Sequence, residues 1–390
     1  MERRRVAVTG LGIISAAGTG REAFWEGLCS TPPEGVRAVK DFDATDWFEN
    51  KKDARRTDRF AQFAIAASAM ALEEAGDVGG DPIRKGVLIG TGIGGLLTLE
   101  DQIITRYEKG ERRVSPFLVP MMMPNAGSAA VSMRFGWQGP CETTVTACAA
   151  GTHSLGNAAR LIQSGRCDAM LAGGSEAAIT PTAVAGFGNM TALSSSGQSR
   201  PFDVRRDGFM IAEGAAVLVL EEWERAKARG ATIMGEILGS ASTADAHHIT
   251  APAPGGLGAI TCMELALEDA GISAARVAHI NAHGTSTPLN DAAEAAAVAK
   301  VFGTPGPPIT SIKGVLGHAL GAAGALEAAA VIISFTKKQL PPTAGYEQPD
   351  PEMEPVNLVV GGPQAWEPGP TISNSFGFGG HNGSLVLAPA

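Results

Sequence analysis

The sequence predicts an α/β protein built from two similar halves. Short apolar strands alternate with helical segments along all 390 residues, which is typical of layered α/β folds. A second observation is an echo at half the chain length, where GAAVLVL at residues 214–220 resembles NGSLVL at residues 382–387. Third, 44% of the residues are hydrophobic and 18% are charged, which suits a large core. We therefore expect two units, residues 1–230 and 231–390, that share one interface.

The predicted elements follow one another without an obvious linker. In the first half the apolar runs predict strands at residues 5–9, 86–89, 169–172 and 215–221, and helices at residues 58–75 and 222–229. In the second half they predict strands at residues 233–238, 277–282, 371–374 and 384–387, and helices at residues 258–270, 292–301 and 323–335. No repeat of 20–50 residues occurs, so a solenoid is excluded.

Charge and composition limit the classes of partner and compartment. The formal net charge of −9 argues against a general nucleic-acid binder, so an acidic partner would have to bind a local basic patch. No apolar run approaches the roughly 18 residues of a membrane helix, and glycines interrupt the apolar start too early for a signal peptide. The five scattered cysteines form no metal-type pair and no even framework, which favours a reducing cytoplasm. They are Cys29, Cys141, Cys148, Cys167 and Cys262.

Cys148 stands at a predicted junction between a strand and a helix. It ends the β-branched run at residues 142–147 and opens a helix that we expect to reach Gln163 and to stop at Gly165. The free N–H groups and the positive end of a helix dipole stabilise a thiolate, and such positions lower a cysteine pKa from about 8.5 to roughly 3.5–7.5. A lone buried cysteine is usually chemically silent. A nucleophilic role for Cys148 therefore depends on residues further along the chain.

Two other motifs do not match the sites that they imitate. GLGIIS at residues 10–15 follows a strand but has a serine at the third glycine position of the dinucleotide fingerprint. HINAH at residues 279–283 has two histidines four residues apart, yet its surroundings predict a strand and no glutamate follows the first histidine. We expect neither a nucleotide site nor a metal site.

Two histidines downstream of Cys148 each adjoin a glycine. His283 lies in NAHGTSTP at residues 281–288, just past a predicted strand, where small residues let a ligand approach the backbone. His318 lies in KGVLGHALGAAGALE at residues 313–327, which begins at Lys313 and ends at Glu327. Each histidine alone would more often be structural. Together with a cysteine at a helix start, they indicate a reactive site.

A glycine-rich segment, NSFGFGGHN, occupies residues 374–382. We expect a loop with exposed backbone amides. It is either a simple turn before the last strand or a source of an oxyanion donor and an aromatic gate.

In this order the motifs resemble those of the β-ketoacyl-acyl-carrier-protein synthases of the elongating, II-like type, which are condensing enzymes of the thiolase superfamily. The resemblance covers almost the whole chain. It includes residues 6–12, 146–148, 207–209, 281–288, 317–327 and 374–380. It implies the thiolase fold, with two similar halves in a five-layered α-β-α-β-α core that dimerises. The first half would carry Cys148, and the second would carry His283 and His318.

The resemblance also implies a decarboxylative Claisen condensation in fatty acid elongation. Cys148 would accept an acyl chain from an acyl carrier protein, and the N–H groups of Cys148 and Phe378 would hold the oxyanion. His283 and His318 would hydrogen-bond the malonyl thioester while carbon dioxide leaves, and the product is a 3-oxoacyl carrier protein.

The same matching assigns supporting roles around this reaction. Lys313 would orient His318, and Glu327 would support that network. Thr285 and Thr287 would contact the phosphopantetheine arm, which the carrier protein delivers, so neither a resident cofactor nor a metal is implied.

Pocket and docking residues follow from the same resemblance. Phe378 would gate the acyl pocket, which would be lined by Ile93, Phe187 and Phe376. An acidic carrier protein would bind basic residues, namely Lys52, Arg55, Arg56, Arg112 and Arg113; from the residues alone these are equally well a solvated charge run.

The chain departs from the family pattern at three positions. Thr191 stands where well-studied members carry a further basic docking residue, His381 replaces a threonine of the C-terminal glycine loop, and Gly314 follows Lys313 where a serine is common. These departures concern carrier docking and the pocket lining rather than the type of reaction.

One alternative function stays open, a ketosynthase subunit of a type II polyketide pathway. Such an enzyme would form a heterodimer with a chain-length partner, whereas we expect a homodimer for fatty acid elongation. A degradative thiolase would need a second cysteine, but none follows Cys262, and an initiating synthase would pair one histidine with an asparagine. A non-catalytic chain-length partner would lack Cys148. Acyl chain length depends on pocket depth and stays open.

Overall fold

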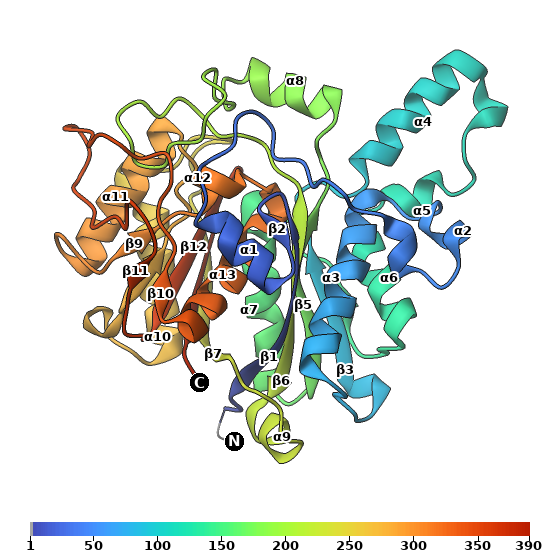
Figure 1. Ribbon diagram of the computed structural model, residues 1–390, viewed down its shortest axis with the longest axis horizontal. Coiled ribbons are helices and arrows are strands. Elements are labelled where there is room, and N and C mark those ends of the chain that lie inside the picture. Colours follow the sequence, from blue (N-terminus) through green and yellow to red (C-terminus); the bar gives the residue numbers. More distant parts are fainter. Residues whose placement is uncertain (1–2) are drawn as a thin grey trace.

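Strands from both ends of the chain meet in one mixed sheet. The computed structural model describes residues 3–390, and within them eleven strands join in this sheet (Figure 1). The first half contributes, from the edge inward, β4 (Cys141–Glu142), β3 (Lys85–Gly90), β5 (Ala169–Glu176), β6 (Gly214–Glu222) and β1 (Val6–Ser15). The second half continues outward with β7 (Gly235–Ala244), β13 (His381–Ala388), β12 (Thr371–Gly377), β8 (His279–Asn281) and β9 (Ile309–Thr310).

The strand order makes the two halves alike. Counted outward from the antiparallel β1–β7 junction, each half has two antiparallel neighbours followed by strands that pair in parallel. The echo between residues 214–220 and 382–387 falls on β6 and β13, which are the first neighbours of that junction on either side. Short strands complete the structure, namely β2 (Gly18–Thr19) beside β1 and the separate pair β10 (Gln339–Leu340) and β11 (Gln364–Ala365).

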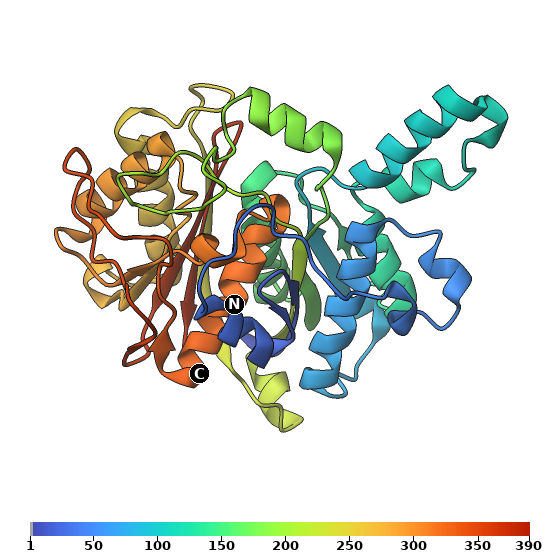
Figure 2. The same ribbon diagram turned by 45° about the horizontal axis from the view of Figure 1, so that its top comes forward.

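Helices fill the space between the halves of the sheet and cover both outer faces (Figures 1 and 2). The central layer is α7 (Ala150–Gln163) packed against α13 (Ala323–Lys337). The outer layers are α3 (Arg59–Ala75) with α6 (Ala126–Phe135), and α10 (Leu257–Ala270) with α11 (Pro288–Phe302). The result is the five-layered α-β-α-β-α core expected from the sequence.

The remaining helices are short or peripheral. They are α1 (Arg21–Leu28), α2 (Lys51–Ala54), α4 (Leu96–Lys109), α5 (Leu118–Met122), α8 (Pro181–Asn189), α9 (Trp223–Ala228) and α12 (Lys313–Leu316). α4 projects from the body of the molecule in both ribbon views (Figures 1 and 2).

Local sequence explains the two best-predicted helices. In α3 the side chain of Asp58 accepts a hydrogen bond from the N–H of Phe60, and Gly76 ends the helix. In α13, 13 of the 15 residues are buried, because a helix between two sheets needs an apolar surface on every side.

The expectation that no apolar run is long enough for a membrane helix is wrong. Leu320–Lys337 is long and apolar enough, by length and composition, to cross a membrane, although no such run was expected. In the structure 89% of this segment is buried inside the protein, where it forms part of the central layer.

Several predicted strands and helices are too short, since β5, β7, β12 and α11 all extend beyond the predicted ranges. Three further differences have a local cause or change the type of element. β1 extends to Ser15, because Gly12 lets α3 approach so closely that a Cβ there would lie 1.7 Å from the carbonyl oxygen of Ala67. The predicted strand at residues 142–147 is wrong, since β4 ends at Glu142 and the chain then turns toward Cys148. The predicted loop at residues 374–382 is largely a hairpin of β12 and β13, which leaves only residues 378–380 as its turn.

His279 makes the folded state sensitive to acid. It is buried on β8, its Nε2 lies 2.9 Å from Thr310 Oγ1, and its ring packs edge-on against Trp366. Burial lowers the pKa of His279 to about 3. Between pH 6.5 and pH 3 the unfolded chain therefore binds a proton that the folded protein does not, so stability falls as the pH falls.

We expect His279→Phe to remove this sensitivity while keeping the ring contact with Trp366. Relative to this variant, wild type should lose about 2 kcal/mol of unfolding free energy between pH 8 and pH 5, as follows from a pKa near 6.5 in the unfolded state. Denaturant unfolding of both proteins at the two pH values measures the difference. A difference that does not change with pH would contradict the assignment.

Candidate active site

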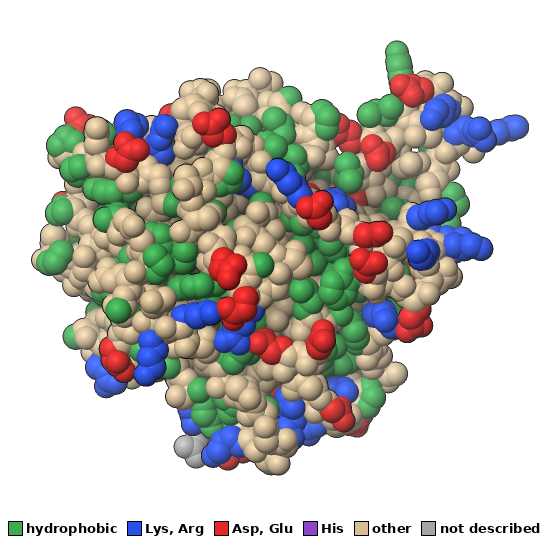
Figure 3. Space-filling model, in the orientation of Figure 1, with side chains coloured by type: hydrophobic (Ala, Val, Ile, Leu, Met, Phe, Trp, Pro, Cys, Tyr) green, Lys and Arg blue, Asp and Glu red, His purple; other side chains and the backbone are tan. Residues whose placement is uncertain are grey.

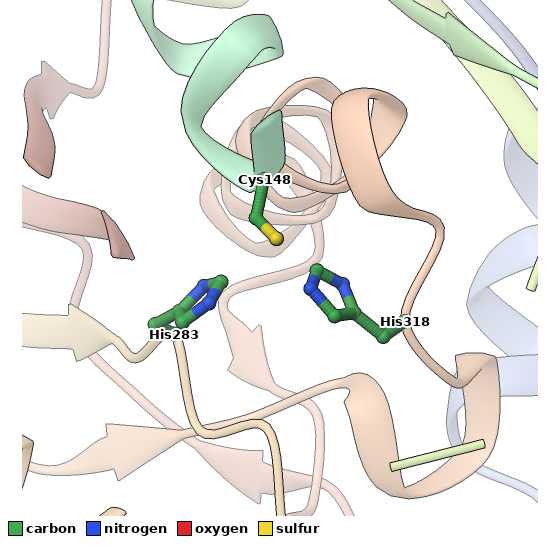
Figure 4. A group of neighbouring side chains, drawn as sticks. All are labelled: Cys148, His283 and His318. Atoms are coloured by element: carbon green, nitrogen blue, oxygen red, sulfur yellow. The ribbon is translucent and has the colours of Figure 1, made fainter. Parts of the chain in front are cut away.

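Cys148, His283 and His318 converge from distant parts of the chain. Cys148 lies at the start of the central helix layer, His283 in the loop after β8, and His318 in the loop after α12 (Figure 4). One potential ligand or reactive atom of each side chain lies within 4.8 Å of the others, and all three residues are buried. The two imidazole rings meet edge to face with their centroids 5.3 Å apart.

A strained turn directs Cys148 toward the histidines. Ala147 has φ +48°, a left-handed conformation that costs a non-glycine residue roughly 1–2 kcal/mol. The chain then forms one 3-10 turn over Ala147–Ala149 and continues directly into α7. The sulfur is thereby held at the N-terminal end of the helix, facing the two imidazoles (Figure 4).

The tip of the C-terminal hairpin rests on the backbone of the cysteine. A Cβ on Gly377 would lie 3.1 Å from the backbone nitrogen of Cys148, so any larger residue there would crowd the backbone of the cysteine. The N–H groups of Phe378 and of Cys148 itself both act on the sulfur and favour its thiolate. Two backbone N–H groups therefore lie near the thiol, and such donors can form an oxyanion hole.

The resting state of Cys148 differs from the expectation. Burial raises the pKa of the Cys148 thiol to about 11, and the Phe378 N–H and the charge of Lys313 offset only part of this effect. The predicted lowering of the pKa by the helix start is thus wrong, because desolvation of the buried sulfur outweighs it. At neutral pH the residue is a thiol and needs a base at the moment of reaction.

Both histidines are neutral. Burial, the charge of Lys313 and the neighbouring His318 hold the pKa of His283 well below its usual value, and burial and Lys313 do the same for His318. Lys313 Nζ lies 3.4 Å from Nδ1 of His283. An ammonium group can only donate, so this contact assigns the proton of His283 to Nε2.

Lys313 and Glu327 form a fully buried ion pair beside His283. Lys313 Nζ donates to the Glu327 carboxylate and, at 2.6 Å, to the carbonyl oxygen of His283. The net pKa of Glu327 is raised to about 7, because burial raises it more than the charge and hydrogen bond of Lys313 lower it. Among the described residues Lys313 contacts His283 and makes no hydrogen bond to His318. No hydrogen bond therefore supports the predicted role of Lys313 in orienting His318, although the charge of Lys313 helps to lower the pKa of His318.

Glu294 was missed from the sequence although it fixes the His283 backbone. Its carboxylate accepts hydrogen bonds from the N–H groups of His283 at 2.8 Å and Gly284 at 2.7 Å. On α11, Glu294 is buried together with Asp291 and Val298. Carboxylates at apolar positions of a helix are the signal that could have identified it.

The three residues open into a cavity of about 360 Å³. Four other predicted site residues also line it, namely Thr285, Thr287, Phe376 and Phe378. Ile93 and Phe187, predicted to line the acyl pocket, are not in the lining of this cavity but pack in an apolar cluster with the predicted gate, Phe378. The apolar part of the cavity wall includes Met190, Phe209 and Leu320.

The predicted docking residues lie on one side of the molecule. Lys52 belongs to α2, and Arg55 and Arg56 follow it, whereas Arg112 and Arg113 lie in the turn after α4. All five are exposed. Figure 3 shows blue side chains gathered along this edge, where Figure 1 places α2 and the end of α4.

Two of the three departures from the family pattern lie near the cavity. Thr191 is exposed and lines the cavity. His381 begins β13 opposite Gly377 and lies outside the cavity lining.

The donor set also resembles that of a zinc site, because cysteine and histidine are the ligands that zinc prefers. A dication there would lie close to the buried ammonium group of Lys313, which would repel it. A nucleophilic thiol beside two neutral imidazoles and two backbone donors fits acyl transfer better.

Comparison with known proteins agrees with this chemistry. Residues 34–226 match the family described as "Beta-ketoacyl synthase, N-terminal domain", and residues 234–347 match "Beta-ketoacyl synthase, C-terminal domain". The chain is 45% identical to a 3-oxoacyl-[acyl-carrier-protein] synthase 2 of Synechocystis, over 99% of this chain and 98% of that protein. It is 42% identical to the protein of the same name from Vibrio harveyi, over 99% of both.

Solved structures of similar proteins share the fold. An ishigamide ketosynthase/chain length factor superposes with a TM-score of 0.94 at 33% identity over the whole of both chains. A second structure holds a type II PKS acyl-carrier protein in complex with its ketosynthase bound to the hexaketide. It superposes with a TM-score of 0.90 at 32% identity, again over the whole of both chains.

Proposed function

The chain belongs to the β-ketoacyl synthase family and is a 3-oxoacyl-[acyl-carrier-protein] synthase of fatty acid elongation, and we propose that Cys148, His283 and His318 carry its reaction. The observation that carries this assignment is the convergence of a buried thiol with two neutral imidazoles and two backbone N–H groups.

The first half-reaction is acyl transfer. The Cys148 sulfur attacks the thioester carbonyl of an acyl carrier protein, and a neighbouring imidazole takes the thiol proton. The tetrahedral oxyanion is held by the N–H groups of Cys148 and Phe378. Collapse breaks the bond to the phosphopantetheine sulfur, which leaves as a thiol with that proton, and the acyl group stays on Cys148.

The second half-reaction forms the carbon–carbon bond. The Nε2–H of His283 and an N–H of His318 donate to the thioester carbonyl of malonyl carrier protein while its carboxylate leaves as carbon dioxide. The electron pair of the broken bond forms an enolate, which attacks the acyl-Cys148 carbonyl and expels the Cys148 thiolate. The thiolate then takes a proton from solvent and becomes the resting thiol again. Neutral imidazoles suit this step, because they donate hydrogen bonds without protonating the carbanion. The product is a 3-oxoacyl carrier protein two carbons longer.

The prosthetic arm belongs to the carrier protein in this proposal, so the enzyme needs no resident cofactor. Thr285 and Thr287 line the cavity, and their hydroxyls lie 2.9 Å apart. They are placed to hydrogen-bond the amide groups of the arm.

Mass spectrometry of the purified protein tests the function directly. Incubation with acyl carrier proteins of graded chain length should add the acyl mass to the peptide that contains Cys148. Subsequent addition of malonyl carrier protein should release a 3-oxoacyl product. Absence of both the adduct and the product at every chain length would refute the assignment. If adduct and product form, their yields at each chain length define the chain-length preference.

We also propose that an acidic carrier protein binds the exposed basic residues near α2. Reversal of two charges, Arg55→Glu with Arg56→Glu, should raise KM for the acyl carrier protein about tenfold and leave kcat nearly unchanged, because rim charges act mainly on encounter. Steady-state kinetics at low salt measures the effect, and added salt should reduce it.

Lys300→Glu on α11 is the matched control, since Lys300 is exposed but distant in sequence from the proposed surface. Equal effects from Lys300→Glu and from the double variant would show that net charge, rather than this surface, controls binding.

We infer that the enzyme is a homodimer. The segment from α4 to β4 exposes apolar side chains, including Ile103, Tyr107, Val119 and Met133. β4 is also the free edge of the large sheet, and such an edge together with an apolar surface favours pairing with a second chain. Light scattering at micromolar concentration should give twice the mass of one chain.

The polyketide alternative has support from the solved structures, one of which pairs a ketosynthase with a chain length factor. The dimer measurement separates the two functions. A homodimer that condenses alone supports fatty acid elongation, whereas activity only with a second subunit supports the polyketide pathway. Neither reaction needs disulfides, and the five free cysteines are consistent with a cytoplasmic location.

A further inference from the structure

His153 is a buried histidine, and each of its two ring nitrogens has a hydrogen-bond partner in another segment of the chain. It lies on α7, five residues after Cys148, and is 8% exposed. Its Nδ1 lies 2.8 Å from Thr146 Oγ1, and its Nε2 lies 3.0 Å from the carbonyl oxygen of Asn382. A carbonyl oxygen can only accept, so Nε2 carries the proton and Nδ1 accepts from the Thr146 hydroxyl.

The two partners belong to the two segments that supply the backbone donors. Thr146 directly precedes the strained residue Ala147 and then Cys148. Asn382 lies on β13, on the hairpin whose turn carries Phe378. The ring of His153 therefore bridges the nucleophile segment and the hairpin at a level close to both N–H groups.

Packing keeps this bridge short. A Cβ on Gly383 would lie 2.9 Å from ring atoms of His153, so the ring lies directly on the β13 backbone. A second link joins the same elements, because Thr152 Oγ1 lies 2.8 Å from Ser375 Oγ on β12. Since Ala147 is strained, the segment before Cys148 would relax if its ties to the hairpin were lost.

We propose that His153 is a positioning residue that fixes the separation between the N–H groups of Cys148 and Phe378. The inference rests on the proposed function, in which these two groups hold the oxyanion. A displacement of 1 Å in such a site can cost a factor of about 100 in rate. The ring does not touch the reacting atoms, so it acts through the backbone on either side of it.

His153→Phe tests the proposal, because it keeps an aromatic ring at this position and removes both hydrogen bonds. We expect acyl transfer to Cys148 to slow 10- to 100-fold, with KM for the acyl carrier protein changed less than threefold. Alkylation of Cys148 by iodoacetamide forms no oxyanion and should change less than threefold. Quenched-flow mass spectrometry measures both modifications of the same cysteine.

Two conservative variants divide the effect between the two bonds. His153→Asn can still accept from Thr146, and His153→Gln can still donate to Asn382, so each should retain more acyl transfer than His153→Phe. Thr146→Val removes the first bond from the other side without changing the ring, and it serves if His153→Phe does not fold. Arg160→Gln is the matched control, because Arg160 also joins α7 to a carbonyl oxygen, that of Ser240, but about two helical turns beyond His153.

The outcomes separate this inference from the proposed function. A wild-type protein without acyl transfer would overturn both. If the wild type is active and the folded His153→Phe and Thr146→Val variants transfer acyl groups within threefold of its rate, the inference about His153 is overturned, whereas the proposed function stands. Equal losses of acyl transfer and alkylation would also overturn it, since they would indicate a general packing role.

Discussion

Cys148→Ala is expected to abolish condensation, with a loss of roughly 10⁵-fold or more in turnover, as for other enzymes that lose their covalent nucleophile. The structure offers no second thiol at this site, because among the described residues the donor group contains one cysteine with His283 and His318. The variant should fold normally, since it removes one sulfur from a turn whose backbone hydrogen bonds persist. Mass spectrometry should find no acyl adduct, and a product assay should find no 3-oxoacyl carrier protein.

Cys167→Ala is the control. Cys167 is buried like Cys148, but it lies just after the C-terminal end of α7 and outside the cavity. It should retain activity close to wild type. Cys148→Gln gives a sharper version of the test. It should also block acyl transfer, yet it can raise malonyl decarboxylation, because the glutamine amide resembles the acylated thiol in shape and polarity. Unchanged condensation in either variant at Cys148 would refute the nucleophile assignment.

His283→Ala and His318→Ala are each expected to lower condensation by 10²- to 10³-fold, or about 3–4 kcal/mol of barrier, the usual cost of losing one oxyanion donor. The two imidazoles face the same cavity and are both neutral, and in the proposed mechanism each supplies an N–H group to the developing enolate. Decarboxylation of malonyl carrier protein should fall by this factor, and acyl transfer should fall less, because the remaining imidazole can still accept the thiol proton.

Separate assays of carbon dioxide release and of Cys148 acylation measure the two half-reactions. His318→Asn should recover part of the decarboxylation lost in His318→Ala, since an amide can still donate. His279→Phe is the matched control, because it replaces a buried histidine of β8 that lies outside the cavity. Equal losses in both half-reactions would contradict a specific role for the histidines in decarboxylation.

Much of the fold could be predicted from the sequence because the buried strands and helices are unusually uniform. β1 is apolar or small at every position, β5 is so up to its last residue, Glu176, and α13 is buried on all sides. Hence period and composition identify these elements without knowledge of their neighbours. The order of the motifs placed Cys148, His283 and His318 in one site, and the structure brings them together.

What could not be predicted depends on contacts between distant segments. The segment after β4 has strand-forming residues, but the turn that places Cys148 overrides their propensity. The pKa of Cys148 is set by burial rather than by the helix start alone. Lys313 forms its histidine hydrogen bonds with His283, which is 30 residues away in sequence, rather than with the nearer His318. None of these three properties is encoded in a local pattern.

The position of β1 at the centre of the sheet has a consequence for synthesis of the protein. Val6 pairs with Glu222 on one side and with Ile237 on the other, so β1 meets these partners only after more than 200 further residues have been made (222 − 6 = 216). At about 5–20 residues per second this interval lasts on the order of 10–40 seconds. Such long-range pairing slows folding. During translation the apolar β1 is therefore a segment that chaperones can bind, and the two halves of the active site assemble only when this late pairing is complete.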